Sequence, residues 1–168
     1  MNWIRVGVTG FCALFIIMAC VDKESQQTVQ LFSEADAEAL RLSEDDILAL
    51  SVQSKGFSQG GPAIKITFPE VSGNDGSSSS SRIEFISPAS LDIEFKENKA
   101  PINYETLEVR GKKFGFSKSI TEHVRPFLSG NLILARNLDL PKGKFLIEIE
   151  IEDTEGRARR KSYFIESR

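Results

Sequence analysis

The spacing closest to a catalytic pattern in this chain is Gly56-Phe57-Ser58-Gln59-Gly60, which matches the Gly-x-Ser-x-Gly sequence of a nucleophile elbow. Asp92 and His123 follow it in the order Ser, Asp, His that acyl transfer at such an elbow uses. An elbow needs a buried strand before the serine and a helix after it, whereas Ser58 lies in a glycine-rich segment that a strand pattern follows. We therefore expect a linker here, and a small serine hydrolase using Ser58, Asp92 and His123 is the enzymatic alternative.

A second candidate chemistry is metal binding. His123 is the only histidine and both cysteines lie within the first twenty residues, so a zinc site lacks ligands. Calcium takes oxygen ligands, and four carboxylates lie close together in the sequence: Glu148, Glu150, Glu152 and Asp153. Basic residues on the next strand are expected to neutralise them, so we predict an ion-paired face without metal or cofactor. A calcium- or glycan-binding module is the alternative.

Length and charge limit the remaining classes. The chain has 168 residues, of which 40% are hydrophobic and 27% charged, and this suits one domain of ordinary size. The 21 basic and 24 acidic residues give a formal net charge of -3, which leaves no excess of positive charge for a nucleic-acid backbone. We expect no nucleic-acid partner.

The first twenty residues have the order of a bacterial lipoprotein signal. Arg5 precedes about fourteen mainly apolar residues, Val6 to Ala19, a length that suits a signal-peptide core and falls short of a membrane span. The stretch ends in Ile17-Met18-Ala19-Cys20, which resembles the lipobox of bacterial lipoproteins. That resemblance implies cleavage before Cys20, a diacylglyceryl group on its thiol and a further acyl chain, such as palmitate, on its new amino group.

An acylated Cys20 would fix the protein to a membrane, because two or three acyl chains hold stably where one binds only marginally. Val21 differs from the aspartate that retains lipoproteins in the inner membrane of enteric bacteria, so the resemblance implies the outer membrane, facing the periplasm. Loss of residues 1–19 removes Arg5 and Trp3, the only tryptophan, and leaves a formal charge of -4.

Residues 20–60 are predicted to form a lipidated, polar tether that is partly helical. Ser33 precedes Asp36, and Ser43 precedes Asp46, with the spacing of helix N-caps. Two alternatives stay open. A free tether would have a mean span of about 35 Å, at roughly 5 to 6 Å times the square root of its length. Packing of residues 33–50 on the domain would instead cover an edge strand.

From residue 61 the pattern changes to short strands in which apolar and polar residues alternate, as in Ile64-Lys65-Ile66 and from Phe145 to Ile151. Short strands with glycine and proline turns and few helices predict an all-β, antiparallel sandwich. Residues 72–81, rich in serine and glycine, are too polar to pack and are expected to form a loop.

Several turns and core positions of this region resemble bacterial Ig-like domains of envelope proteins. They are Gly61-Pro62-Ala63-Ile64-Lys65-Ile66, Ser87-Pro88 before Leu91 to Phe95, Pro101-Ile102-Asn103 before Thr106-Leu107, Leu140-Pro141-Lys142-Gly143, and Asp153-Thr154-Glu155-Gly156-Arg157. The resemblance implies an Ig-like β-sandwich over residues 61–168. The resemblance concerns the fold and assigns no catalytic residue.

The last two strands are predicted to form a hairpin across a turn at Asp153 to Gly156. Pairing Phe145 with Phe164 places three acids, Glu152, Glu150 and Glu148, opposite Arg157, Arg159 and Lys161. The same register turns Arg160 and Ser162 inward, so we expect either a bulge or an open rim there. The phenylalanines, mostly at inward strand positions, are assigned to the core.

These patterns together predict an envelope lipoprotein with a signal peptide at 1–19, a tether at 20–60 and an Ig-like domain at 61–168. We expect a binding or structural module without catalytic activity. Its expected partners are a membrane, through Cys20, and an envelope protein or polymer.

Overall fold

The computed structural model describes residues 28–53, 60–69 and 82–168. The predictions for Cys20, for Ser58 and for residues 72–81 lie outside these ranges. The strands are β1 (Val29–Gln30), β2 (Ala63–Thr67), β3 (Arg82–Phe85), β4 (Ala89–Lys96), β5 (Ile102–Lys113), β6 (Phe116–Ser119), β7 (Leu128–Ser129), β8 (Leu132–Asp139), β9 (Gly143–Asp153) and β10 (Ala158–Ser167). The helices are α1 (Glu34–Leu40), α2 (Glu44–Gln53), α3 (Thr121–Val124) and the 3-10 turn η1 (Arg125–Phe127).

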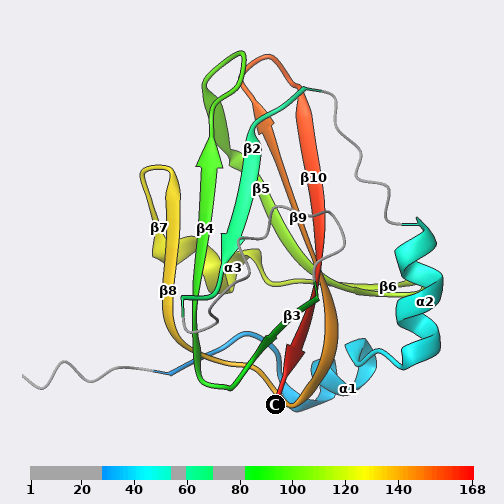
Figure 1. Ribbon diagram of the computed structural model, residues 1–168. Helices are drawn as coiled ribbons and strands as arrows, with labels where there is room; N and C mark the ends of the chain where they lie inside the picture. The colour runs from blue at the N-terminus through cyan, green and yellow to red at the C-terminus, as the bar shows by residue number, and fades with distance from the viewer. Residues whose placement is uncertain (1–27, 54–59, 70–81) are drawn as a thin grey trace, which may run out of the picture.

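The described strands form two sheets that face each other (Figure 1). One sheet has the order β2-β4-β8, with β7 and β1 on the far edge of β8, and the other has the order β3-β10-β9-β5-β6. The prediction of a mostly β fold is confirmed. The prediction of a wholly antiparallel arrangement is wrong at two edges, because β1 pairs with β8 and β3 pairs with β10 in parallel.

The hydrophobic core lies between the sheets and follows the predicted alternation. On β4 every second side chain from Ala89 to Phe95 is buried, and on β9 Phe145, Ile147, Ile149 and Ile151 point into the same cluster. Burial of each such aliphatic or aromatic side chain contributes about 1.5–3 kcal/mol, so the alternation fixes which face of each strand turns inward.

The two N-terminal helices begin where the sequence predicts. The Ser33 hydroxyl accepts a hydrogen bond from the Asp36 N–H at 3.1 Å, and Ser43 does the same for the Asp46 N–H at 3.1 Å. In return the Asp46 carboxylate accepts a hydrogen bond from the Ser43 N–H at 2.8 Å, which completes a capping box. Both N-cap predictions are confirmed.

Residues 29–50 belong to the packed domain, so of the two alternatives the structure has the packing of residues 33–50, and a free tether is not found from Val29 to Leu50. Phe32, Ala37 and Leu40 are buried in the main core. Further along, Leu42 packs with Leu146 and Phe164 in a second cluster that α2 covers through its half-buried apolar side chains Ile47 and Leu50. The chain therefore passes round the end of β9, with α1 on the inner face of the sheet and α2 on its outer face (Figure 1).

The β9–β10 hairpin has a register one residue away from the predicted one. Phe145 pairs with Ile165, and Glu150 pairs with Arg160, because the turn holds three residues, Thr154 to Gly156, rather than four. Gly156 has a φ of 75°, the left-handed conformation that ends such a turn at low cost. Arg160 and Ser162 consequently face outward with the acids. The ladder runs without a register shift, so the predicted bulge or open rim is absent from it.

Within the described residues, no helix has both the length and the apolar character needed to cross a membrane.

Candidate functional site

Among the described residues, no contact joins Asp92 and His123 of the hydrolase alternative. Asp92 lies on the outward face of β4, where its carboxylate pairs with Arg136. His123 is exposed on α3, and its backbone N–H donates to the Ile120 carbonyl at 3.0 Å. The carboxylate that would orient the imidazole is therefore held by an arginine. Ser58 lies outside the described residues.

The four carboxylates considered for calcium are divided between separate contacts. Glu148 and Glu150 lie among basic side chains on the outer face of β9. Asp153 is buried, where it binds the Arg157 side chain at 2.7 Å. Among the described residues, no group of three or more His, Cys, Asp or Glu side chains is placed to hold a metal ion. The predicted ion-paired face is confirmed for Glu148 and Glu150, although their basic partners differ from those predicted.

An ion-paired band crosses β5, β9 and β10 on the outer face of the sheet. Arg160 holds Glu150, with Nη2 and Oε2 2.8 Å apart, and Lys112 Nζ lies 3.2 Å from each oxygen of Glu148. Glu108 pairs with Arg110, which also approaches both acids of β9. Positive and negative charges are equal in number in the band, so it presents a polar face without a field of one sign.

Two exposed aromatic side chains lie together at the tip of the β5–β6 hairpin, whereas Ile86, at 77% exposure, and Leu48, at 67%, are exposed elsewhere. Phe114 is 46% exposed and Phe116 is 41% exposed, on either side of Gly115, whose φ of 66° closes the turn. The assignment of these two phenylalanines to the core is wrong, because both lie at the connection between β5 and β6, where their side chains are exposed. The hairpin tip, Lys113 to Phe116, is the candidate site.

Helices α1 and α2 hold the base of this hairpin from two sides. Lys118 Nζ lies 3.3 Å from an Asp36 carboxylate oxygen of α1, while Lys113 Nζ donates to the Arg41 carbonyl at 2.7 Å and lies 3.8 Å from Asp46 of α2. Both aspartates have a pKa below the usual value. The hydrogen bond from the Ser33 hydroxyl is the main cause for Asp36, with Lys118 adding to it, and the Ser43 N–H is the main cause for Asp46.

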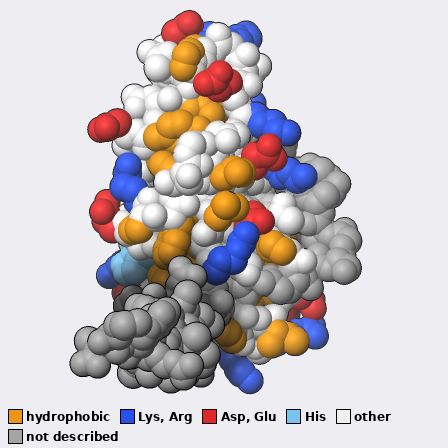
Figure 2. All heavy atoms as spheres, turned by 90° about the vertical axis from the view of Figure 1, so that its left-hand side faces the viewer, with side chains coloured by type: hydrophobic (Ala, Val, Ile, Leu, Met, Phe, Trp, Pro, Cys, Tyr) orange, Lys and Arg blue, Asp and Glu red, His pale blue; other side chains and the backbone are white. Residues whose placement is uncertain are grey.

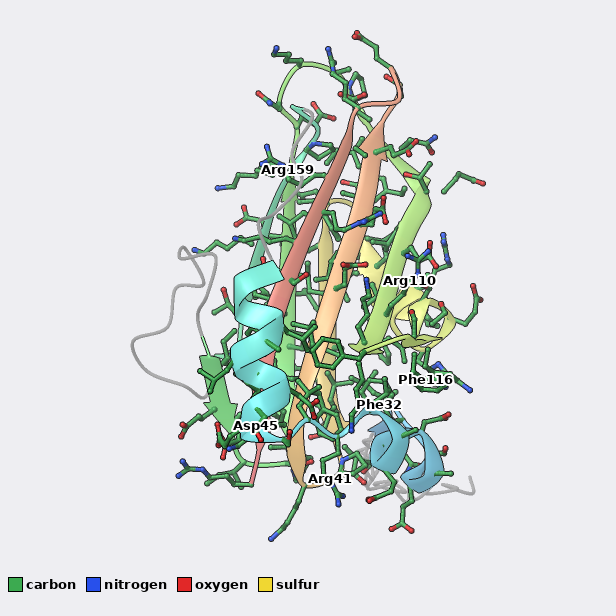
Figure 3. The ribbon with its side chains drawn as sticks, turned by 90° about the vertical axis from the view of Figure 1, so that its right-hand side faces the viewer. Phe32, Arg41, Asp45, Arg110, Phe116 and Arg159 are labelled. Carbon is green, nitrogen blue, oxygen red and sulfur yellow. The ribbon has the colours of Figure 1, made fainter. Side chains whose placement is uncertain are left out.

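Beneath the tip, the hairpin packs directly on α1. Gly111 of β5 lies so close to Phe32 and Leu40 that a Cβ atom at this position would come within 2.8 Å of both side chains. Figure 3 shows Phe116 and Phe32 on the same side of the molecule, beside α1. The close approach and the two lysine contacts fix the hairpin relative to the helices, so Phe114 and Phe116 are presented on a firmly held support.

The opposite side of the molecule has a different character. Figure 2 shows the face formed by β7, β8 and neighbouring elements, where hydrophobic side chains lie in small patches separated by charged and uncharged polar groups. Leu134, on the outward face of β8, is 40% exposed, close to the value for Phe116. Leu134 lies within a strand and not at a turn, and single exposed apolar residues are ordinary on protein surfaces.

A scan of the sequence against protein-family models gives no match, and a search of curated proteins gives none either.

Sequence reasoning missed the hairpin tip although one signal for it was present. Phe114-Gly115-Phe116 puts two aromatics around a glycine turn, and lysines flank it at 112, 113 and 118. A turn is the place where a strand pattern leaves the covered part of a sheet, so aromatic residues at such a turn are candidates for contact with another surface.

Proposed function

We propose that this protein is a bacterial envelope lipoprotein, anchored by acylated Cys20 in the outer membrane facing the periplasm, with a non-catalytic Ig-like module. The observation that carries the proposal is the sequence Ile17-Met18-Ala19-Cys20 at the end of an apolar stretch of signal-peptide length, nine residues before the first strand. A signal peptide followed by a folded domain is the order expected of such a protein.

The Ig-like part of the proposal is supported by strand order. The sequence β2-β4-β8-β7 in one sheet and β10-β9-β5-β6 in the other corresponds to strands ABED and GFCC′ of the immunoglobulin sandwich. Strand β3 then adds to the edge of β10. Cross-strand nuclear Overhauser contacts between β7 and β8, and between β3 and β10, test this assignment in solution.

The proposal of a binding or structural role, rather than catalysis, is supported by the contacts of the polar groups. Asp92, Glu148, Glu150 and Asp153 are each held by an arginine or lysine of the same chain. The exposed feature most suited to contact is the hairpin tip with Phe114 and Phe116. The partners of the module are the membrane and an envelope protein or polymer, and nucleic acid is not among them.

The deciding experiment compares two cysteine variants expressed in a bacterium with an outer membrane. Cys20→Ser is expected to abolish labelling with a palmitate analogue and either to release the protein from the membrane or to leave it as an uncleaved precursor. Cys12→Ser, within the apolar stretch, is the matched control and is expected to behave as the unaltered chain does. Mass spectrometry that finds an unmodified Cys20 thiol at the start of the mature chain would overturn the proposal.

A further inference from the structure

The hairpin tip differs from the other exposed apolar positions because two aromatic side chains share one turn. Phe114 and Phe116 are both more than two-fifths exposed, although phenylalanine is among the residues most often buried. Exposed apolar side chains that lie close together mark surfaces that contact another protein or a membrane. The tip therefore has the apolar character that a contact with a bilayer needs.

The charges around the tip allow this contact without exposing an unpaired cation. Lys112, Lys113 and Lys118 flank the phenylalanines, and their ammonium groups lie 3.2–3.8 Å from carboxylates of Glu148, Asp46 and Asp36 respectively. Because these pairs are neutral, adhesion would come from the apolar side chains and not from attraction to anionic headgroups. The contact should accordingly change little with salt or with the fraction of anionic lipid.

The covalent distance from the anchor limits which part of the domain can meet the membrane. Nine peptide steps separate Cys20 from Val29, and they span at most about 32 Å when fully extended. Strand β9 has 11 residues, or about 36 Å, and Val29 pairs with Leu138, near the end at which β9 begins. The turn at the other end of β9 would therefore lie beyond the reach of even a fully extended linker.

The hairpin, in contrast, is connected to the entry of the chain by short steps. Phe32 follows Val29 by three residues and lies against Gly111, and Gly111 precedes the tip by two residues. Each of these steps covers about 10 Å or less. A domain resting on its hairpin tip is thus within easy reach of an anchor at Cys20.

We propose that Phe114 and Phe116 insert into the interface of the bilayer that holds Cys20 and so fix the orientation of the domain on the membrane. This inference rests on the proposed function, because two phenylalanines alone would adhere weakly. Tethering by the acyl chains keeps the tip at a high effective concentration near the lipid, which makes a weak contact persistent. The β9–β10 turn then faces away from the membrane and is left free for a partner.

A tryptophan introduced into the mature chain gives a direct optical test. The sequence has one tryptophan, Trp3, and it lies before Cys20, so cleavage there leaves a mature chain without tryptophan. Phe116→Trp and Leu134→Trp each introduce a single reporter, at positions of 41% and 40% exposure on opposite sides of the molecule. Each acylated variant is reconstituted into phosphatidylcholine vesicles with and without phosphatidylglycerol, and its emission is recorded with ordinary and with brominated acyl chains. Phe114→Trp is the second variant if Phe116→Trp does not fold.

The expected result is a shift to shorter wavelength and a loss of emission on brominated lipid for Phe116→Trp, in both lipid mixtures. Leu134→Trp is expected to keep its emission. Equal quenching of the two variants, or quenching of Leu134→Trp alone, overturns the proposed orientation, and so does emission from position 116 that is unaffected by the lipid, as a protein-binding tip would give. The mass of the Cys20 residue, measured first, shows separately whether the anchoring proposal has failed.

Discussion

Arg160 and Glu150 lie directly opposite each other on β10 and β9, and the guanidinium binds the carboxylate through both Nε, at 3.1 Å, and Nη2, at 2.8 Å. The pair is part of the ion-paired band on the outer face of the sheet, in which Glu148 is the most buried member at 6% exposure. Cross-strand pairs of this kind contribute roughly 0.2–1 kcal/mol each. Because Glu148 is buried, substitution at this position should lower the stability of the domain more than substitution at the other positions of the band.

Removing the Glu148 carboxylate should therefore destabilise the domain more than removing a surface acid. Glu148→Ala leaves Lys112 without its partner in a partly enclosed site, and a cost of about 1–3 kcal/mol is expected. Glu84→Ala, which removes one of the two acids that Arg168 approaches, at an exposed pair, should cost about 0–1 kcal/mol. Urea unfolding followed by circular dichroism measures both. Equal costs would contradict the importance assigned to the buried acid.

The alternation of side chains along β9 and β10 was predictable, but the register between them was not. A hairpin with a three-residue turn and one with a four-residue turn both bring acids opposite basic residues in this sequence, because Arg157, Ala158, Arg159, Arg160 and Lys161 place cations on both faces of β10. The register is set by the buried Asp153, whose carboxylate accepts hydrogen bonds from the backbone N–H groups of Glu155 and Arg157 at 3.0 Å. Such a contact cannot be inferred from charge pairing alone.

The helix starts at Ser33 and Ser43 were predictable because capping depends on neighbours in the sequence. The packing of these helices was not predictable, because α1 and α2 contain few apolar residues, and one of these, Leu48, is 67% exposed. The decisive residues are Gly111, where the absence of a Cβ admits Phe32, and the outward-facing pair Leu146 and Phe164, which receives α2. Both contacts join segments far apart in the chain.

The contact between β2 and β10, which belong to different sheets, should depend on the Tyr163 hydroxyl. It donates to the Ile64 carbonyl at 3.3 Å, and Arg159 donates to the Pro62 carbonyl at 3.1 Å, so side chains of β10 satisfy the edge of β2. Tyr163→Phe is expected to lower the free energy of unfolding by about 0.5–1.5 kcal/mol. Tyr104→Phe is the control, since Tyr104 packs edge-on against Phe95 and its hydroxyl has no hydrogen-bond partner among the described residues.

Because the Tyr163 hydroxyl is buried, we also expect the domain to lose stability in alkali. Burial raises the pKa of its hydroxyl well above the ordinary value of 10.0, so the unfolded chain ionises at a lower pH than the folded one. The stabilisation is complete below pH 10 and decreases as pH rises above it. The free energy of unfolding of Tyr163→Phe should therefore decrease less between pH 9 and pH 11 than that of the unaltered chain. Parallel curves for the two proteins would contradict this assignment.

Because the Asp153 carboxylate is held by hydrogen bonds in the folded chain, we expect the domain to lose stability in acid. Burial opposes ionisation of its carboxyl, but hydrogen bonds from the Arg157 side chain and from the Arg157 and Glu155 N–H groups outweigh it and hold the pKa below the usual value. A lowered pKa stabilises the fold above the unfolded value of about 3.9, and this contribution is lost as pH falls below that value. Asp153→Asn should lower the midpoint of thermal unfolding at pH 7 and flatten its dependence on pH below 4. A midpoint that changes with pH as steeply as in the unaltered chain would exclude this role.

The two N-terminal helices supply the test of where the domain begins. Leu40 of α1 is 1% exposed in the main core, and Leu48 of α2 is 67% exposed, so the same substitution can be made in both helices with opposite expectations. Leu40→Ala is expected to lower the free energy of unfolding by about 2–5 kcal/mol, because it removes buried methyl groups and leaves a cavity against Gly111 and Phe32. Leu48→Ala should change it by no more than about 0.5 kcal/mol. Urea unfolding of the mature chain measures the difference. If Leu40→Ala is as stable as Leu48→Ala, then α1 does not belong to the folded unit, the support beneath the hairpin tip is lost, and the boundary of the domain moves back towards residue 61.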